Sequence, residues 1–299
     1  MRPLTDRRHF SVAFPNVPGR VSHVWGFISH FLASEGCMPS QFEMSQIAGH
    51  AENERSERCL KLTANEIAAL IDKRRLDGFR VSGGYSETAF DIFLLNAKDI
   101  GPQCFVGCRV ERKASVPEEW GRLIEDLVGS FASIGGWQWH ELYQSWQRLS
   151  ERGKLYERAF GVVPPGFRTW SEPGPIALTP QPERVFLDTS KNPGRSKELT
   201  FRIHFYSTAE MWLGPHFWQY AKCTKEEVLA ADFFLEKRDT PHFLYLKCWP
   251  QPFTRPDGEQ GRMQQRLWKL FFHEDCEWPP GSGSICDEPM YGPPELMPG

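Results

Sequence analysis

The sequence predicts an α+β protein with two domains, each a mostly antiparallel sheet with packed helices. Short runs of alternating apolar residues, which are typical of strands, occur in both halves of the 299-residue chain. Strands that pair as hairpins are mixed with amphipathic segments at helical spacing, and this mixture is typical of the α+β class. A proline-rich stretch separates the two halves, and a chain of this length suits two domains.

The N-terminal domain is expected over residues 1–160. Its opening strand is predicted where Phe10, Val12 and Phe14 fall on one face of an alternating segment. Thr63 and Glu66 form a capping-box pattern that predicts the start of a second helix, because each side chain can satisfy a free backbone donor. The predicted elements are a strand at 9–14, helices at 20–34 and 63–74, strands at 79–82, 89–96 and 103–111, and helices at about 118–131 and 140–158. The turn Gly83–Ser86 is expected to join the second and third strands.

A linker is expected at 161–183, because its prolines favour a stiff, extended connection. The C-terminal domain should then cover 184–273. Thr224 and Glu227 form another capping-box pattern, and the helix that they begin is expected to run to about Arg238. The other predicted elements are strands near 184–188, 199–206 and 242–248 and a final helix at 258–272. The stretch from Trp212 to Trp218 packs three aromatic residues around a Gly-Pro break and is expected to form a buried corner.

The last 26 residues, 274–299, form an acidic tail. They carry six acidic side chains and no basic one, together with six prolines and four glycines. The rest of the chain is slightly basic, so this segment alone makes the net charge negative. A segment so rich in Pro and Gly cannot build its own core. We therefore expect it to lie over the body of the protein or to present acidic and aromatic groups to a partner.

Composition bears on the kind of partner. An isoelectric point near 6.3 leaves no basic footprint for nucleic acid. No stretch approaches the roughly 20 apolar residues that cross a bilayer, and the N-terminus lacks the apolar core of a signal peptide. We therefore expect a cytoplasmic protein that binds neither nucleic acid nor membrane. The eight cysteines include no Cys-x-x-Cys pair, so free thiols are expected.

One weak catalytic pattern is present. Asp91 lies on one predicted strand, and Glu111 and Lys113 lie at the end of the next, as in Mg²⁺-dependent nucleases of the restriction-endonuclease type. The simpler interpretation is an ion pair between Glu111 and a neighbouring basic residue. The run His273–Cys276 offers four possible ligands, but adjacent residues rarely converge on one metal. We expect no catalysis, no metal and no cofactor.

The N-terminal half resembles the immunity proteins of bacterial polymorphic-toxin systems, in particular the immunity protein 52 type. The resembling segments are the strand Phe10–Phe14, VWGFISHFLA at 24–33, LTANEIAALIDKRRLDGF at 62–79, AFDIFLLN at 89–96 and CFVGCRV at 104–110. They fall within residues 8–135, under half of the chain. The resemblance lies in the order and texture of the elements, so no functional residue of the family is transferred to this sequence.

The resemblance implies an immunity protein that binds a cognate antibacterial toxin, such as a nuclease delivered by type VI secretion, and blocks or distorts its active site. An acidic and aromatic surface is complementary to the cationic cleft of a nuclease. Two candidate surfaces follow from this, the 83–87 turn and the tail. The expected partner-binding residues are Tyr85, Glu87, Asp275, Glu277, Trp278, Asp287, Glu288 and Tyr291. An effector chaperone or adaptor is the alternative among binding proteins.

Overall fold

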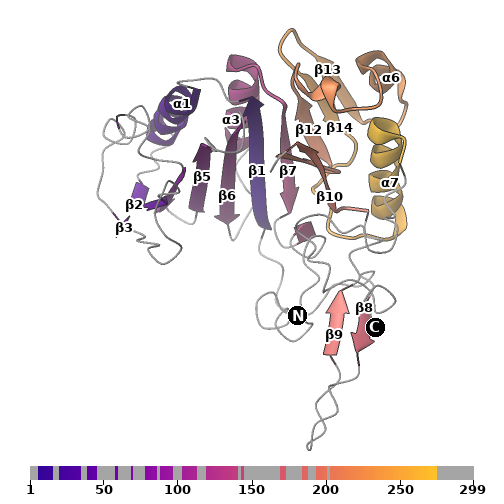
Figure 1. Cartoon of the computed structure of the whole chain (residues 1–299), viewed down its shortest axis with the longest axis horizontal. Helices are drawn as coiled ribbons and strands as arrows, with labels where there is room; N and C mark the ends of the chain where they lie inside the picture. Colours follow the sequence, from indigo (N-terminus) through magenta and orange to yellow (C-terminus); the bar gives the residue numbers. More distant parts are fainter. Residues whose placement is uncertain are drawn as a thin grey trace, which may run out of the picture. The chain divides into compact units, whose positions relative to one another are not determined.

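The computed structural model forms two compact units (Figure 1). Unit 1 consists of Met1–Gln138, Glu210–Tyr220 and Glu236–Lys247, and unit 2 of Trp139–Ala209, Ala221–Leu235 and Cys248–Gly299. Both are made of discontinuous segments, whereas the sequence suggested consecutive domains. The structure describes residues 6–15, 20–34, 39–45, 58–59, 69, 78–85, 88–96, 103–112, 119–140, 143–144, 169–172, 184–187, 193–200 and 203–274. For residues 6–7, 20–22, 39–45, 58–59, 78–85, 88–96, 103–112, 119–120, 169–172 and 184–187 it describes the backbone only.

Unit 1 is built on a ten-stranded sheet in the order β13-β14-β12-β7-β1-β6-β5-β4-β2-β3. Its strands are β1 (Asp6–Pro15), β2 (Pro39–Ser45), β3 (Arg58–Cys59), β4 (Gly78–Tyr85), β5 (Thr88–Asn96), β6 (Gln103–Arg112), β7 (Gly135–His140), β12 (Glu210–Leu213), β13 (Glu236–Asp239) and β14 (Leu244–Lys247). The pairs β1–β6, β5–β6, β4–β5, β2–β4, β7–β12, β12–β14 and β13–β14 are antiparallel. Helices and antiparallel sheets together confirm the α+β class.

The N-terminal strands follow the predicted pattern closely. β1, β4, β5 and β6 contain the four strands expected from alternation. The predicted turn is displaced, however. Gly83 and Gly84 lie inside β4, and Tyr85 pairs with Thr88, so the connection is the two residues 86–87. The glycines misled the prediction because glycine is typical of turns, whereas here the ladder continues through both of them.

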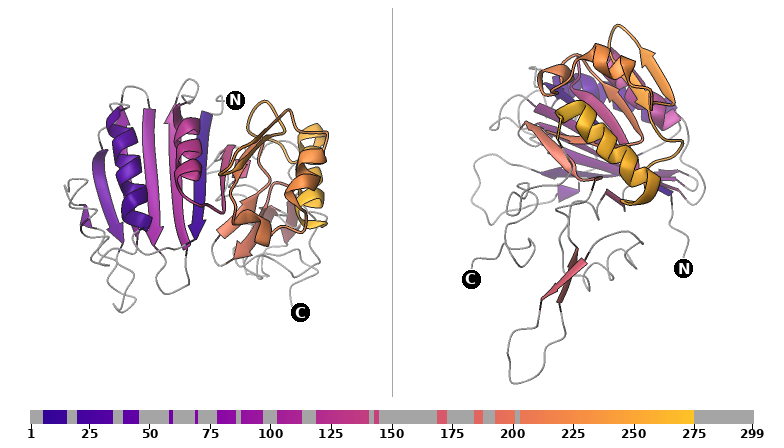
Figure 2. Two further views of the ribbon diagram at one scale, coloured as in Figure 1. Left: turned by 90° about the horizontal axis from the view of Figure 1, so that it is seen from above. Right: turned by 90° about the vertical axis from the view of Figure 1, so that its right-hand side faces the viewer.

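Two helices cover one face of this sheet, α1 (Arg20–Ser34) and α3 (Glu119–Ser130), and both were predicted (Figure 2). The Phe131 ring lies edge-on to Phe14 of β1 at 5.7 Å and to Phe27 of α1 at 6.3 Å. This aromatic group therefore joins both helices to the sheet. Because Phe14 lies on the helix side, alternation places Phe10 and Val12 there as well. Most of the expected helix near 63–74, and residues 145–158 of the helix expected at 140–158, lie outside the described residues.

β7 is a strand that sequence patterning missed. All six of its residues are buried, so it has no alternation between buried and exposed positions. It pairs with β12, where Gly136 lies opposite Trp212 and Trp137 opposite Met211. A side chain on Gly136 would come within 2.8 Å of Ile124 Cγ2 on α3. The glycine thus lets the helix pack directly on the point where the two distant parts of the chain are paired.

The strands β12, β13 and β14 come from the part of the chain expected to form a separate C-terminal sheet, yet they continue the sheet of unit 1. Thr224 and Glu227 do form the predicted capping box, but α6 (Lys225–Ala230) ends eight residues before Arg238. Arg238 lies in β13, whose four residues are all exposed. With no buried position, β13 carries no strand pattern, and its Glu-Lys-Arg run resembles a helix.

The Trp212–Trp218 stretch begins as β12 and ends in the 3₁₀ helix η1 (Phe217–Gln219). Trp212 is 3% exposed and Phe217 is fully buried, which confirms the predicted buried corner. Gly214 is packed tightly in this corner, because a Cβ atom there would lie well inside 3 Å of the Ser133 carbonyl oxygen. Its amide also donates to the carbonyl of Ile134 at 3.0 Å.

The described part of unit 2 includes two hairpins and the helices α6 and α7. Its elements are β8 (Thr169–Glu172), β9 (Arg184–Leu187), β10 (Ser196–Thr200), β11 (Ile203–Tyr206), α6 and α7 (Gly258–Phe272). β8 pairs with β9, so part of the expected linker is a strand. β10 and β11 form a hairpin where one strand was expected at 199–206. The α7 rings Phe271 and Phe272 lie 5.2 and 5.0 Å from Phe205 of β11, which packs the helix on this hairpin.

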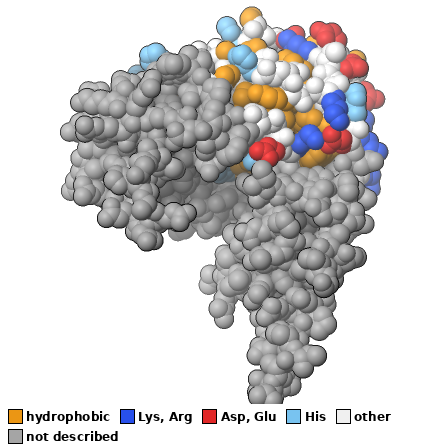
Figure 3. Space-filling model, viewed as in Figure 1, with side chains coloured by type: hydrophobic (Ala, Val, Ile, Leu, Met, Phe, Trp, Pro, Cys, Tyr) orange, Lys and Arg blue, Asp and Glu red, His pale blue; other side chains and the backbone are white. Residues whose placement is uncertain are grey.

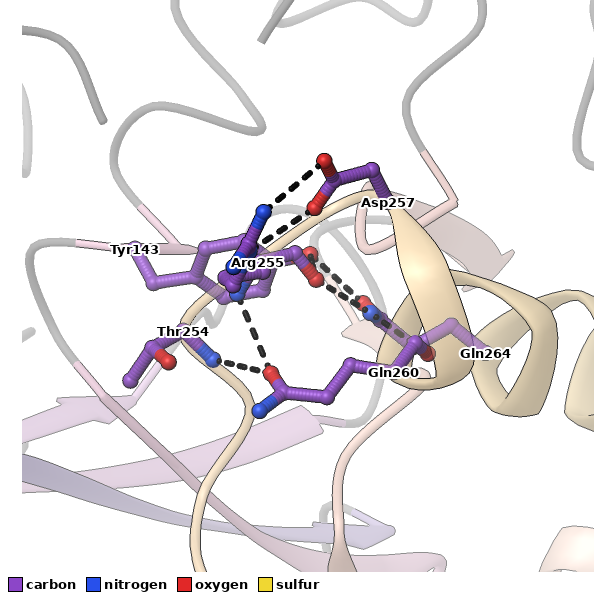
Figure 4. A network of polar contacts seen from close by, with 6 residues as sticks. All are labelled: Tyr143, Thr254, Arg255, Asp257, Gln260 and Gln264. Atoms are coloured by element: carbon purple, nitrogen blue, oxygen red, sulfur yellow. Dashed lines mark hydrogen bonds and ion pairs between the residues drawn. The ribbon is translucent and has the colours of Figure 1, made fainter. Parts of the chain in front are cut away.

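A polar network holds the start of α7 (Figure 4). The buried Gln264 accepts from the Tyr143 hydroxyl at 2.8 Å and donates to the carbonyls of Arg255 and Gln260 at 3.1 Å. Gln260 in turn accepts from the amides of Thr254 and Arg255, at 2.8 and 3.1 Å. The backbone groups of the turn before α7 are thereby satisfied by two glutamines of the helix itself.

No helix among the described residues combines the length and the apolar character needed to cross a membrane.

Two glycine substitutions test the packing around the corner. Gly214→Ala should lower the free energy of unfolding by about 1–3 kcal/mol, because the new Cβ atom meets backbone that cannot move aside. Gly26→Ala is the control, since Gly26 is exposed in α1 with nothing within 4 Å of its missing Cβ. It should raise stability by up to about 1 kcal/mol through helix propensity. Urea unfolding measures both, and a neutral Gly214→Ala would contradict the packing described.

Candidate functional site

The described part of unit 1 carries a polar and aromatic cluster at the β13 edge of its sheet. We call it the edge cluster, and it consists of Glu125 of α3, Glu210 and Trp212 of β12, Arg238 of β13, and Tyr245 and Lys247 of β14. The register places these strand residues on one face, because Tyr245 lies opposite both Trp212 and Arg238, and Lys247 lies opposite Glu210. Glu125 shows that this is the face covered by α3. The sheet and one helix thus bring residues more than 100 positions apart into contact.

Arg238 is the most exposed member of the edge cluster, and it contacts three other residues. Its guanidinium forms an ion pair with Glu125 and another, at 3.1 Å, with Glu236. It also lies over the Tyr245 ring, 4.3 Å from the centroid, while 44% of the side chain stays exposed. The hydrogen bond from Arg238 to Glu125 raises the pKa of the arginine above its ordinary value. The group is therefore a permanent cation held in one orientation.

The aromatic members are buried and bonded to carboxylates. Trp212 Nε1 donates to Glu125 Oε1 at 3.3 Å, and the Tyr245 hydroxyl donates to Glu210 Oε1 at 3.1 Å. Burial, and after it the charge of Glu210, raise the pKa of Tyr245 well above its ordinary value. The hydroxyl therefore remains a donor at every physiological pH. Lys247 completes the group with an ion pair to Glu210 at 2.7 Å.

Glu210 also connects the cluster to the centre of the sheet. In the amide orientation that satisfies both neighbours, Gln138 of β7 donates to Glu210 Oε2 at 2.8 Å and accepts from Arg8 Nη1 at 2.9 Å. Polar contacts thus run across four strands, from β14 through β12 and β7 to β1. Such a network fixes side-chain positions more firmly than isolated surface ion pairs do.

The chemistry of the edge cluster suits binding. Arg, Tyr and Trp are the residue types that contribute most to protein interfaces, and a side chain already held in place loses little freedom on association. Among the residues that the structure describes, no three His, Cys, Asp or Glu side chains are placed to share a metal ion. Cys223 and Cys248 are buried and form no disulfide, and the Cys248 thiol donates to the carbonyl of Thr208 at 3.6 Å. Burial, with a contribution from Glu227, raises the pKa of Cys223 to about 11, so this thiol stays protonated at neutral pH.

The residues of the nuclease-like pattern lie on β5 and β6. Asp91 pairs with Arg109, and Glu111 pairs with Ala89, two positions from Asp91. The two acidic positions therefore share a sheet face and are diagonal neighbours. Arg109 stands opposite Asp91, and Arg7 of β1 stands opposite Glu111. Lys113 lies outside the described residues.

The predicted partner-binding residues are mostly beyond the described part of the chain. Tyr85 is the last residue of β4. Glu87 and the tail residues Asp275, Glu277, Trp278, Asp287, Glu288 and Tyr291 lie outside it. Their role stays a prediction. The edge cluster was missed in part because its outermost strand, β13, was expected to be helical. The sequence did offer a signal for the cluster: the pairs Glu210–Trp212 and Tyr245–Lys247 are each spaced by two, as residues on one face of a strand are.

The tail begins at a defined point in unit 2. Glu274, the last described residue, forms ion pairs with Lys197 at 2.5 Å and with Lys222 at 2.8 Å. Burial alone would raise the pKa of Glu274, but the hydrogen bonds from the two lysines outweigh it and lower the pKa. The preceding residue, His273, ends α7 in the left-handed conformation with φ of 54°. We call this group of Glu274, Lys197 and Lys222 the tail clamp.

A double-mutant cycle tests the edge cluster. Glu125→Gln and Arg238→Gln should each lower the free energy of unfolding, and the double variant should lose about 0.5–1 kcal/mol less than the sum, since the pair is partly exposed. Arg122→Gln, on the exposed side of the same helix, is the control and should change stability by no more than about 0.5 kcal/mol. Simple additivity in urea unfolding would show that the ion pair contributes nothing.

The pH dependence of stability tests the tail clamp. Glu274→Gln should lower the free energy of unfolding at pH 7 by about 0.5–1 kcal/mol, a value reduced for exposure. Because the folded protein lowers this pKa, the contribution is present above the ordinary value of 4.5 and is lost as pH falls through the folded pKa. The difference between wild type and variant should therefore shrink below pH 4.5. A difference that persists in acid would contradict the assignment.

Comparison with known proteins adds one finding about the fold. No family model matches the chain, and no curated protein matches it either. Its resemblance to the immunity protein 52 type therefore stays a prediction. Among solved structures, the chain is similar to a protein described as "Pseudomonas aeruginosa T6SS protein PA0821", with a TM-score of 0.52 and 10% sequence identity. The similarity covers 93% of this chain and 77% of that chain, so the two proteins share a fold over most of their length.

Proposed function

We propose that this protein is an immunity protein of a type VI secretion system, which binds a cognate antibacterial toxin in the cytoplasm and blocks or distorts its active site. The observation that carries the proposal is the fold shared with a T6SS protein over 93% of the chain. The order of the N-terminal elements supports it independently, because the strand, helix and hairpin segments that resemble immunity proteins include β1, α1, β5 and β6.

The edge cluster supports a role in binding. A protein that neutralises a toxin needs a surface with fixed shape and charge, and it needs no chemistry of its own. The rigid Arg238, backed by the buried rings of Tyr245 and Trp212, has the composition of an interface anchor. The acidic tail is the second candidate surface, since carboxylates can steer association with a cationic nuclease. We therefore expect the toxin to contact the edge cluster of unit 1 and the acidic residues of the tail.

Co-expression tests the function. The chain should restore growth to bacteria that produce the toxin encoded by the neighbouring gene, and the two proteins should elute together in gel filtration. Continued cell death with no complex would contradict the proposal. A stable complex in which the purified toxin keeps its full activity would instead identify an effector chaperone or adaptor.

The edge cluster can be tested in the same complex. Arg238→Ala should weaken toxin binding by about 10- to 30-fold, as for an anchor worth roughly 1.4–2 kcal/mol. Arg238→Lys should not restore binding, because an ammonium ion lacks the planar group that stacks on Tyr245. Lys237→Ala is the matched control, an adjacent exposed cation on the opposite face of β13. Isothermal titration calorimetry measures all three, and equal effects of Arg238→Ala and Lys237→Ala would exclude the edge cluster from the interface.

A further inference from the structure

α7 has two sharply different sides. Its buried side consists of Gly261, Gln264, Leu267, Trp268, Phe271 and Phe272. Its exposed side carries Arg262, Arg266 and Lys269, spaced four and three residues apart, so these cations follow one stripe along the helix. The only acidic residue on the helix is Glu259, in its first turn. A cation in the last turn, such as Lys269, is expected from the helix dipole, but Arg262 and Arg266 are too far from that end for the same explanation.

More basic groups surround the C-terminal end of α7. The Lys222 amide donates to the Phe271 carbonyl at 2.8 Å, and its side chain belongs to the tail clamp. Lys197 lies over the rings of Trp268 and Phe272, at 5.7 and 5.0 Å. Arg266 lies against the Phe233 ring, 4.2 Å from its centroid, and forms an ion pair with Asp232. Because Asp232 is 91% exposed, this ion pair is weak. Basic and acidic side chains are interleaved with apolar ones over the described surface seen in Figure 3.

We propose that this basic stripe of α7 binds the acidic segment 275–299 of the same chain. The segment carries five acidic residues and no basic one, so its charge is complementary to the stripe. The tail clamp fixes its starting point, because Glu274 is held beside the last turn of the helix. The segment therefore begins at the C-terminal end of α7, the end at which the stripe finishes with Lys269.

The length of the segment is sufficient. Arg262 lies 11 residues before His273, which is about 17 Å along a helix that rises 1.5 Å per residue. A coil of 25 residues, the number in this segment, would have a root-mean-square span of about 25–30 Å. Attachment at Glu274 also gives the segment an effective concentration in the millimolar range, so weak ion pairs can hold it in place. The contact should weaken with salt, because the charges that make it are exposed.

If the tail also meets a toxin, as the proposed function suggests, then α7 and the cationic surface of the toxin compete for the same carboxylates. The stripe would then act as an internal substitute for the toxin. It would cover the tail in the free protein and disfavour weak binding to unrelated basic proteins. This consequence depends on the proposed function, whereas the contact between tail and helix does not.

Rapid hydrogen–deuterium exchange of the full-length protein tests the contact without any toxin. At about 10 mM salt, amides within 275–299 should exchange several-fold, on the order of fivefold, more slowly than their intrinsic rates. At about 0.5 M salt, where screening is strong, the protection should disappear. Arg262→Gln/Lys269→Gln should remove the protection at low salt too. The control Arg122→Gln/Lys237→Gln removes two exposed cations from unit 1 and should leave it unchanged.

Two results would overturn the proposal. The tail could exchange at its intrinsic rates in the wild-type protein at low salt, which would show that it is not bound. Alternatively, protection could survive the α7 substitutions, which would place the tail on another surface. Neither result bears on toxin neutralisation, so failure here is distinguishable from failure of the proposed function. Far-ultraviolet circular dichroism of the α7 variant verifies that the helix itself is intact, since both replaced residues are exposed.

Discussion

The pairing of β7 with β12 is the contact on which unit 1 depends. It joins the sheet made by the first 140 residues to three strands that come some 70 residues later. Gly136 is decisive there, because any side chain would press against Ile124 and lift α3 from the sheet. Burial is complete on both sides of the junction, with Trp137 and Met211 fully buried and Trp212 nearly so. The apolar surface removed from water at this point is what holds two distant segments of the chain in one sheet.

The candidate site is a consequence of that pairing. Glu125 belongs to a helix of the N-terminal segment, whereas Trp212, Arg238 and Tyr245 belong to the later strands. Their contacts exist only because β12 continues the sheet beneath α3. Within the cluster, partly exposed carboxylates and the buried Tyr245 ring hold Arg238 at the surface in one orientation. A surface prepared in this way is suited to recognition, because the entropy of ordering the side chains has been lost on folding rather than on binding. Unit 2 has its own charged features, the tail clamp and the basic stripe of α7.

Much of the fold could be predicted from local patterns, and the parts of the unit 1 sheet that carry the edge cluster could not. α1, α3 and α7 alternate clearly between buried and exposed residues, and β1 carries its large apolar side chains at every second position, Phe10, Val12 and Phe14. The predicted bounds of these four elements agree with the structure to within a few residues. β7 is buried throughout and β13 is exposed throughout, so neither shows the alternation of buried and exposed residues that predicts a strand. The joining of β12 to β7 is a long-range pairing with no local signal. The edge cluster was missed for the same reason, since its residues are neighbours only after that pairing is made.

Native-state hydrogen exchange across a series of urea concentrations tests the central claim most directly. If β7 and β12 are joined as described, the amides of Met211 in β12, Trp137 in β7 and Val12 in β1 should merge at one opening free energy and be exposed by the same cooperative unfolding event. If Met211 instead opens at a much lower free energy than Val12, independently of urea, then β12 belongs to a separately unfolding part, and the basis for the edge cluster is lost.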